Sequence, residues 1–538
     1  MNKLFFGDNL DILREHIATD SVDLIYLDPP FNSKRDYSVL FKTPKGHESD
    51  AQITAFEDSW HWGEQAEREF NELLHCNNTD VAEMMLALRK FLKENDMMAY
   101  LTMMANRLLE LHRVLKPTGS LYLHCDPNAS HYLKILLDAV FGQKGYRNEI
   151  VWQRTNAHNA AKQYGRINDT IFFYTKSEEY TWNDSRTPYG EEQLKRYKKD
   201  KDGRLYTCQD LTASRPNSDS GKFEWRGTMP TPSRGWGYKL EQLEAWWEEG
   251  KIATKRDGTP RMDGLIVYLD EMAGKALQSV WTDIPRISNT SPERLPYPTQ
   301  KPLALLERII KASSNEGDVV LDPFCGCGTA VHAAEKLRRQ WIGIDITHLA
   351  ISLIEKRLKD AFPGIQFEVE GTPKDLGGAR NLAERHKYQF QWWATSLVGA
   401  QPYQGKKKGA DSGIDGLIFF HDDKSGAKKI VVSVKGGENV SVAMVRDFAH
   451  VIEREQAAMG FFVTLAEPTG PMSKESVAFG FYDEPRFGAE YPKLQILTIE
   501  GLMSGTERPR YPDLSLGRST FKRAQIEDVS GEQERMEL

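Results

Sequence analysis

Two short segments, almost three hundred residues apart, each follow an apolar run that predicts a buried strand. The runs are residues 22–27 and 318–321, and the segments that follow them are Asp28-Pro29-Pro30-Phe31 and Asp322-Pro323-Phe324-Cys325-Gly326-Cys327-Gly328-Thr329. Short apolar runs of this kind are typical of parallel strands, and open α/β sheets bind ligands in the crevice at the carboxyl ends of such strands. The sequence therefore predicts an α/β domain whose site is assembled from two distant stretches of chain.

The residue types in the two segments suit a base amine and a nucleoside. Asp28 offers a carboxylate, Pro29 a carbonyl, and Phe31 a ring on which a base can stack. Two acceptors can take both N–H bonds of an exocyclic amine and free its lone pair for attack, which is catalysis by positioning and electrostatics. In the second segment, Gly326 and Gly328 permit a turn that brings backbone close to a nucleoside.

The length of 538 residues predicts more than one domain. Strand-like runs alternate with amphipathic helices in two separated stretches, and between them Gly, Pro, Arg and aromatic residues mix without a steady period, as in a loop-rich binding insert. We therefore divide the chain into two halves of the first domain (1–180 and 279–362), an insert (181–278), a polar linker (363–387), a second α/β domain (388–516) and a disordered tail (517–538).

Composition predicts a cytoplasmic protein that does not enter a membrane. The chain has no run of eighteen apolar residues, no signal-peptide pattern, and five cysteines that give no disulfide framework. The Gly-rich turn already explains the small residues around Cys325 and Cys327, so we expect no metal there. A net charge of −7 does not exclude DNA, because binding needs only a local basic face. Residues 195–199 and 406–408, and the stretch with Arg226 and Arg234, are such basic segments, with a solvated surface as the alternative.

The order of five motifs resembles the β-class DNA amino-methyltransferases, which include the modification subunits of type III restriction systems. The motifs are Gly7-Asp8-Asn9, Asp28 to Phe31, Tyr297 to Pro302, Asp322 to Thr329, and Gly343-Ile344-Asp345. The resemblance covers about residues 1–360. It implies a Rossmann-like, S-adenosylmethionine-dependent methyltransferase with a target-recognition insert. It also implies duplex DNA as substrate, a role in restriction–modification or phage defence, and assembly as a homodimer or with a restriction or defence partner subunit.

The resemblance further assigns residues to roles. Asp28, Pro29, Pro30 and Phe31 form the target-base site, which receives a base flipped out of the helix. Thr299 and Lys301 contact the carboxylate end of the cofactor, and Asp345 takes its ribose hydroxyls. Asp8 lies beside the cofactor adenine, and capping of the helix at 10–15 is an alternative compatible with that role. The remaining cofactor-binding residues are Asp322, Pro323, Phe324, Gly326, Gly328 and Thr329.

Several alternatives stay open at this point. Asp28 favours adenine N6 over cytosine N4, because in the family Ser-Pro-Pro is the commoner opening for cytosine. A DNA-binding module with vestigial sites is disfavoured, because both motifs are intact, and RNA methylation is a further alternative. His124 and Asp126 could serve a metal or acid–base chemistry, but we favour a strand-end pair that supports the site.

From Tyr388 onward the chain contains Asp415 and then the alternating run Val431-Val432-Ser433-Val434-Lys435, in which period two puts residues 433 and 435 on one face of a strand. This pattern resembles the Mrr-like restriction endonucleases of the PD-(D/E)xK group. Asp415 and Lys435 fit the metal-ligand and catalytic-lysine positions, and Ser433 stands where the family carries Glu, Asp or Gln. Asp415 is therefore the candidate Mg²⁺ ligand, but the missing carboxylate argues against robust cleavage. The sequence leaves three readings: a nuclease with altered metal ligation in a combined restriction–modification enzyme, a domain that only grips DNA, or a domain that docks a partner.

Overall fold

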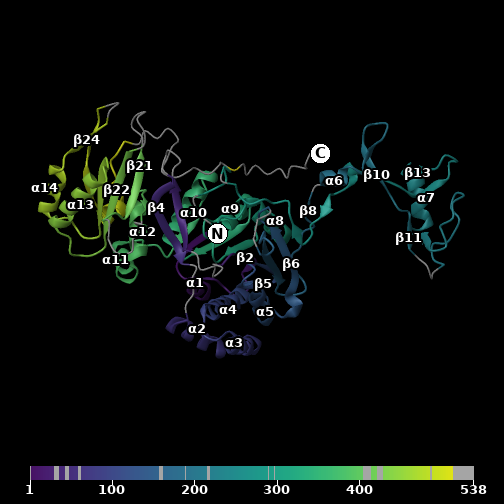
Figure 1. Cartoon of the computed structure of the whole chain (residues 1–538), viewed down its shortest axis with the longest axis horizontal. Coiled ribbons are helices and arrows are strands. Elements are labelled where there is room, and N and C mark those ends of the chain that lie inside the picture. Colours follow the sequence, from purple (N-terminus) through teal and green to yellow (C-terminus); the bar gives the residue numbers. More distant parts are fainter. Residues whose placement is uncertain are drawn as a thin grey trace. The chain divides into compact units, whose positions relative to one another are not determined.

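A nine-stranded sheet forms the centre of the first domain in the computed structural model (Figure 1). The structure describes residues 2–29, 36–42, 48–57, 62–156, 162–187, 189–214, 219–288, 290–295, 297, 299–403, 413–420, 428–484, 488–512 and 527. In spatial order the strands are β16 (Val280–Trp281), β6 (Tyr146–Gln153), β7 (Asn168–Thr175), β5 (Leu115–Cys125), β2 (Val22–Leu27), β17 (Val319–Asp322), β18 (Gln340–Asp345), β1 (Lys3–Phe6) and β19 (Glu368–Glu370).

The strands at the middle of this sheet are parallel and buried on both faces. β5, β2, β17, β18, β1 and β19 pair in parallel, whereas β7 pairs antiparallel with both β5 and β6. In β2 every residue except Asp23 is buried, which agrees with the nearly continuous apolar run, since two-sided burial removes polar alternation. β2 and β17, whose ends carry the two sequence motifs, are direct neighbours.

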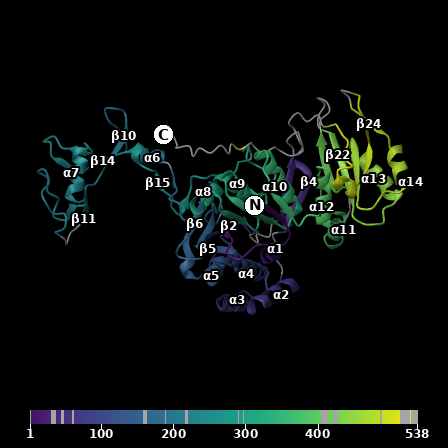
Figure 2. The same ribbon diagram turned by 180° about the vertical axis from the view of Figure 1, so that it is seen from behind.

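Helices cover both faces of the sheet (Figures 1 and 2). One core cluster joins Ile25 and Leu27 of β2 to α1 (Asn9–His16), α2 (Glu64–Leu74), α3 (Thr79–Leu92), α4 (Asp96–Val114) and α5 (Ser130–Phe141). A second cluster joins Leu24 and Tyr26 to α8 (Leu303–Ser313), α9 (Thr329–Lys336) and α10 (His348–Ala361). Successive side chains of β2 point to opposite faces of the sheet and therefore pack in two different cores.

Residues 184–278 belong to a separate compact unit. Its four-stranded sheet has the order β13 (Ile252–Thr254), β14 (Pro260–Tyr268), β10 (Leu205–Gln209) and β9 (Lys198–Lys199). Trp225, Trp236 and Leu243 of α7 (Leu240–Glu248) lie in a small core with Leu211, Ile252 and Leu265. Further short pairs are β8 (Arg186–Thr187) with β15 (Lys275–Ala276), and β11 (Thr212–Ser214) with β12 (Arg234–Trp236). These short strands explain why no period is visible in the sequence.

The C-terminal sheet has the order β20 (Gln401–Pro402), β21 (Gly416–Phe420), β22 (Lys428–Lys435), β23 (Met459–Thr464) and β26 (Leu494–Thr498). β21 and β22 are antiparallel, and β22, β23 and β26 are parallel. The sheet packs with α12 (Lys387–Leu397), α13 (Val442–Arg454), α14 (Gly470–Ala478) and α15 (Ile499–Ser504). Among the described residues, no helix is long and apolar enough to cross a membrane.

The segment predicted as a polar linker contains secondary structure. Its first part forms β19, which pairs with β1, and its second part forms α11 (Leu376–Arg385). Leu376, Ala379 and Leu382 recur at helical spacing and pack in a core cluster of the C-terminal domain. The prediction of an irregular linker was therefore wrong. The apolar stripe of α11 is narrow, and the surrounding residues are polar. The predicted tail lies outside the described residues apart from Glu527.

Candidate active site

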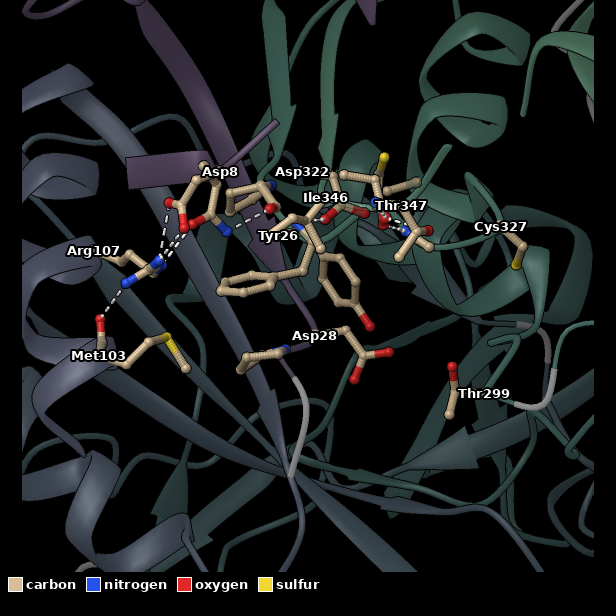
Figure 3. Close-up of a pocket in the computed structure, with 18 of the residues that line it drawn as sticks. Asp8, Tyr26, Asp28, Met103, Arg107, Thr299, Asp322, Cys327, Ile346 and Thr347 are labelled. Carbon is tan, nitrogen blue, oxygen red and sulfur yellow. Dashed lines mark hydrogen bonds and ion pairs between the residues drawn. The ribbon is translucent and has the colours of Figure 1, made fainter. Parts of the chain in front are cut away.

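A cavity of about 410 Å³ brings the two sequence motifs together (Figure 3). It lies beside the ends of β2, β17 and β18, where an open α/β sheet is expected to bind a ligand. The residues from the sequence analysis that line it are Asp8, Asp28, Pro29, Thr299, Lys301, Asp322, Pro323, Phe324, Gly326, Thr329 and Asp345. Pro30 and Phe31 lie outside the described residues.

The turn between β17 and α9 is held in a form that requires glycine. Gly326 and Gly328 have φ angles of +50° and +73°. A Cβ on Gly326 would lie 3.2 Å from the Tyr297 ring, and one on Gly328 would lie 2.7 Å from Ile354. Gly328 is the N-cap of α9 and does not line the cavity, whereas Gly326 does. The first glycine therefore shapes the cavity wall, and the second allows close packing of α9 on α10.

Asp345 at the end of β18 braces this turn. One carboxylate oxygen accepts the Gly326 N–H at 2.9 Å, and the other accepts the N–H and hydroxyl of Thr347, each at 2.8 Å. Burial raises the pKa of Asp345 to about 6 in spite of these bonds, and burial also raises the pKa of Asp322 well above its usual range. Asp322 and Asp345, two carboxyl groups that are costly to ionise, thus line the same cavity. Such perturbed carboxyl groups are typical of ligand-binding sites.

Asp28 forms an ion pair with Lys301 inside the cavity. The two side chains are only 17% and 12% exposed, so the pair is largely shielded from water. Lys301 comes from the segment just before α8, whereas Asp28 follows β2. The fold therefore joins the predicted catalytic carboxylate to a residue predicted to contact the cofactor, a contact that sequence reasoning did not suggest.

Sequence analysis missed Arg107, a buried residue of α4. Its guanidinium donates to both oxygens of Asp8 at 2.9 and 3.1 Å, to Asn9, and to the Met103 carbonyl at 3.1 Å. Asn9 in turn donates to the Pro323 carbonyl at 2.8 Å, so this network ties the Gly7-Asp8-Asn9 motif to the glycine turn after β17. Asp8 also accepts from the Leu10 N–H at 2.8 Å, which confirms the N-cap interpretation. A lone arginine within the apolar stretch 97–108 was the available signal.

His124 is part of a buried chain of hydrogen bonds that crosses three strands. Its Nδ1 lies 3.0 Å from the Tyr26 hydroxyl and its Nε2 lies 3.2 Å from Asp169. Burial raises the pKa of Asp169, but the hydrogen bond and charge of His124, with the charges of Lys301 and Arg154, outweigh it and leave that pKa below its ordinary value. Asp126 instead accepts backbone N–H groups of Asn128 and Ala129 at the start of α5. The supporting role favoured for His124 thus involves Tyr26, which lines the cavity.

The nuclease-like residues lie on neighbouring strands of the C-terminal sheet. Asp415 comes just before β21, and its carboxylate accepts the Val434 N–H of β22 at 2.6 Å. Ser433 is 1% exposed, and Lys435 is half-buried at the end of the same strand. The described part of the chain contains no group of three or more His, Cys, Asp or Glu residues that could hold a metal ion. The basic segment 406–408 lies outside that part.

Comparison with known proteins adds two family matches. Residues 22–356 match the family model described as DNA methylase, and residues 389–503 match the model described as NACHT-associated inactive Restriction Endonuclease 1. The first of these matches covers more than half of the chain. The second covers most of the C-terminal sheet and its helices.

Two curated relatives agree with the first match. Type II methyltransferase M.EcaI of Enterobacter cloacae is 33% identical over 48% of this chain and 57% of its own length. DNA adenine methyltransferase YhdJ of Escherichia coli is 24% identical over 71% of this chain and 91% of its own length. The solved complex of M1.HpyAVI with SAM aligns over 66% of this chain and 99% of its own, with 15% identity and a TM-score of 0.32. This chain spans about half the length of several curated relatives.

Proposed function

Since this chain belongs to the DNA methylase family, we propose that it transfers a methyl group from S-adenosylmethionine to adenine N6 at a specific sequence in duplex DNA. One observation carries the proposal above all others. A single cavity joins Asp28 and Pro29, suited to an exocyclic amine, to the glycine turn and Asp345, suited to a nucleoside. Neither half alone would indicate group transfer between two ligands.

The cavity fits the proposed cofactor in size and in chemistry. Its volume of about 410 Å³ falls within the range of small-molecule sites. Gly326 lets backbone approach the ligand, and Asp345 can accept from ribose hydroxyls while it holds the turn. Thr299 and Lys301 supply a hydroxyl and a cation for a carboxylate. When bound, S-adenosylmethionine supplies an electrophilic methyl group on a sulfonium sulfur.

The chain's own residues would act on the target base by positioning it. The Asp28 carboxylate and the Pro29 carbonyl accept the two N–H bonds of the amine, which turns the nitrogen lone pair toward the cofactor side of the cavity. The base must first leave the helix, at a cost of a few kcal/mol. We propose that stacking on Phe31 returns about 1–3 kcal/mol of that cost. No covalent nucleophile is needed.

Adenine is proposed over cytosine on two grounds. The chain opens its target-base motif with Asp28, the residue that the family resemblance associates with adenine, and a relative similar over 71% of this chain is a DNA adenine methyltransferase. Incubation of the purified chain with plasmid DNA and S-adenosylmethionine, followed by mass spectrometry of the nucleosides, tests the assignment. We expect N6-methyladenine. Detection of N4-methylcytosine instead would show that cytosine is the substrate base. Methylation of RNA alone would overturn the assignment to DNA.

We further propose that the unit at 184–278 reads the DNA sequence. Its described arginines are largely neutralised by nearby carboxylates: Arg186 by Asp184, Arg204 by Asp270, Arg226 by Glu244, Arg234 by Asp210 and Arg261 by Asp263. Lys195, Arg196, Lys198 and Lys199 are exposed, and no ion pair with them is seen in the described part of the unit. The exposed cations at the edge strand β9 are therefore our candidates for phosphate contact, in preference to the paired Arg226 and Arg234.

Removal of the two β9 lysines should reduce the salt dependence of DNA binding. Each phosphate contact contributes about 0.9 to the slope of log K against log salt concentration. The double variant Lys198→Ala/Lys199→Ala should therefore lower that slope by about one to two, measured by fluorescence anisotropy on duplex DNA. Arg226→Ala is the matched control, because Glu244 already neutralises that charge. An equal decrease of the slope in both variants would contradict this placement. An unchanged slope in both variants would also contradict it, and is the result expected if the lysines only protect the edge strand from pairing.

We propose that the C-terminal domain does not cleave DNA. Ser433 is buried where a metal carboxylate would be required, and the Asp415 carboxylate bonds the backbone of β22. Plasmid incubated with the purified chain and Mg²⁺ or Mn²⁺ should remain intact on a gel, or be nicked slowly at most. Rapid double-strand cleavage that Asp415→Ala or Lys435→Ala eliminates would instead identify a combined restriction and modification enzyme.

We also propose that the chain acts in the cytoplasm, either as a homodimer or with a restriction or defence partner subunit.

A further inference from the structure

Two cations line the described wall of the cavity, and they are held in different ways. Arg107 is 5% exposed and its guanidinium is committed to Asp8, Asn9 and the Met103 carbonyl. A planar guanidinium bound on three sides is a fixed part of the structure. Lys301 reaches Asp28 with a single ammonium group at the end of a flexible chain. Lys301 is therefore the cation of this wall that can change partner.

The contact between Lys301 and Asp28 conflicts with the proposed chemistry of Asp28. A carboxylate that accepts an N–H bond of a target amine must offer an oxygen to that amine, and the Lys301 ammonium group competes for the lone pairs of Asp28 Oδ2. The carboxylate of the cofactor also needs a cation, because Asp28 and Asp345 line the same cavity and Arg107 is already bound to Asp8. One lysine thus faces two carboxylate partners.

We propose that Lys301 is a positioning residue that moves from Asp28 to the cofactor carboxylate when the cofactor binds, and so releases Asp28 for the target amine. This inference rests on the proposed function. Before cofactor binding, Lys301 compensates the buried charge of Asp28, which would otherwise be costly to keep in the cavity. After cofactor binding, Asp28 is available to the base. Cofactor and base therefore favour each other, and the coupling is reciprocal.

The exchange predicts a distinct pattern of cofactor binding in the absence of DNA. The ligands are S-adenosylhomocysteine and 5′-deoxy-5′-(3-aminopropylthio)adenosine, which lacks only the carboxylate; the method is calorimetry on the full chain. Asp28→Asn removes the competitor for Lys301 and should tighten S-adenosylhomocysteine about threefold or more. It should not tighten the analogue without a carboxylate. Lys301→Met should weaken S-adenosylhomocysteine about tenfold and change the analogue little.

The double variant separates exchange from simple charge repulsion. If Asp28 only repelled the cofactor carboxylate, Asp28→Asn would tighten S-adenosylhomocysteine as much without Lys301 as with it. The exchange requires a clearly smaller gain in the Lys301→Met background, and equal gains would overturn it. Lys311→Met, on the exposed side of α8 with 56% of its side chain accessible, should match the unaltered chain. Failure of the unaltered chain to bind either ligand would contradict the proposed function itself, and the exchange with it.

Discussion

Asp28→Ala is expected to abolish methyl transfer, with a loss of at least about a hundredfold in rate. Asp28 is proposed to accept the amine that is methylated, and removal of one preorganised polar group at a reacting centre costs about 10² to 10³ in rate. Transfer of a labelled methyl group to DNA at saturating cofactor measures the effect. Retention of more than about a tenth of the rate, a penalty under about 1.4 kcal/mol, would show that Asp28 does not hold the amine.

The accompanying measurements separate catalysis from folding and cofactor binding. Cofactor affinity of Asp28→Ala should be no weaker than that of the unaltered chain, because the glycine turn after β17 and Asp345 at the end of β18 keep their contact with each other. Asp11→Ala, an exposed carboxylate of α1, is the matched control and should leave the rate unchanged. If cofactor binding falls together with the rate, the Asp28→Ala result reports structural damage rather than a catalytic role.

Exchange of residues 184–278 for the corresponding unit of a relative is expected to move methylation to another sequence. The unit has its own buried core around Trp225 and Trp236, so it can be replaced without opening the nine-stranded sheet. The cavity residues lie outside the exchanged segment and should keep their activity. Methylated sites mapped by sequencing decide the outcome. If an active chimaera methylates the original sequence, another part of the chain recognises the DNA sequence and the insert has a structural role.

The sequence predicted the parts of the site that follow continuous apolar strands. The α/β fold class is confirmed, because runs such as residues 22–27 are buried on both faces and leave little alternative to a parallel strand. Asp28, Asp322 and Asp345 meet because their strands are adjacent and parallel, so local pattern and topology agree.

Other parts of the site could not be predicted, because they depend on contacts between residues far apart in the sequence and the local sequence pattern gives little indication of them. The Lys301 pair with Asp28 joins residues 273 positions apart, and the Arg107 pair with Asp8 joins residues 99 apart. The sequence suggests a pair of His124 and Asp126, which are neighbours in the chain, whereas the structure pairs His124 with Asp169 on the adjacent strand β7. In the linker, α11 was missed because its apolar stripe is narrow and the rest of the helix is polar.

The activity that we propose for this chain is methylation of adenine N6 at a defined DNA sequence. Long-read sequencing of DNA from cells that express the chain, compared with cells that express Asp28→Ala, reports base, site and strand together. We predict N6-methyladenine at one recurring sequence, present with the unaltered chain and absent with Asp28→Ala. The same modification pattern in both samples, or a modified base other than adenine, would show that the chain is not an adenine-N6 methyltransferase.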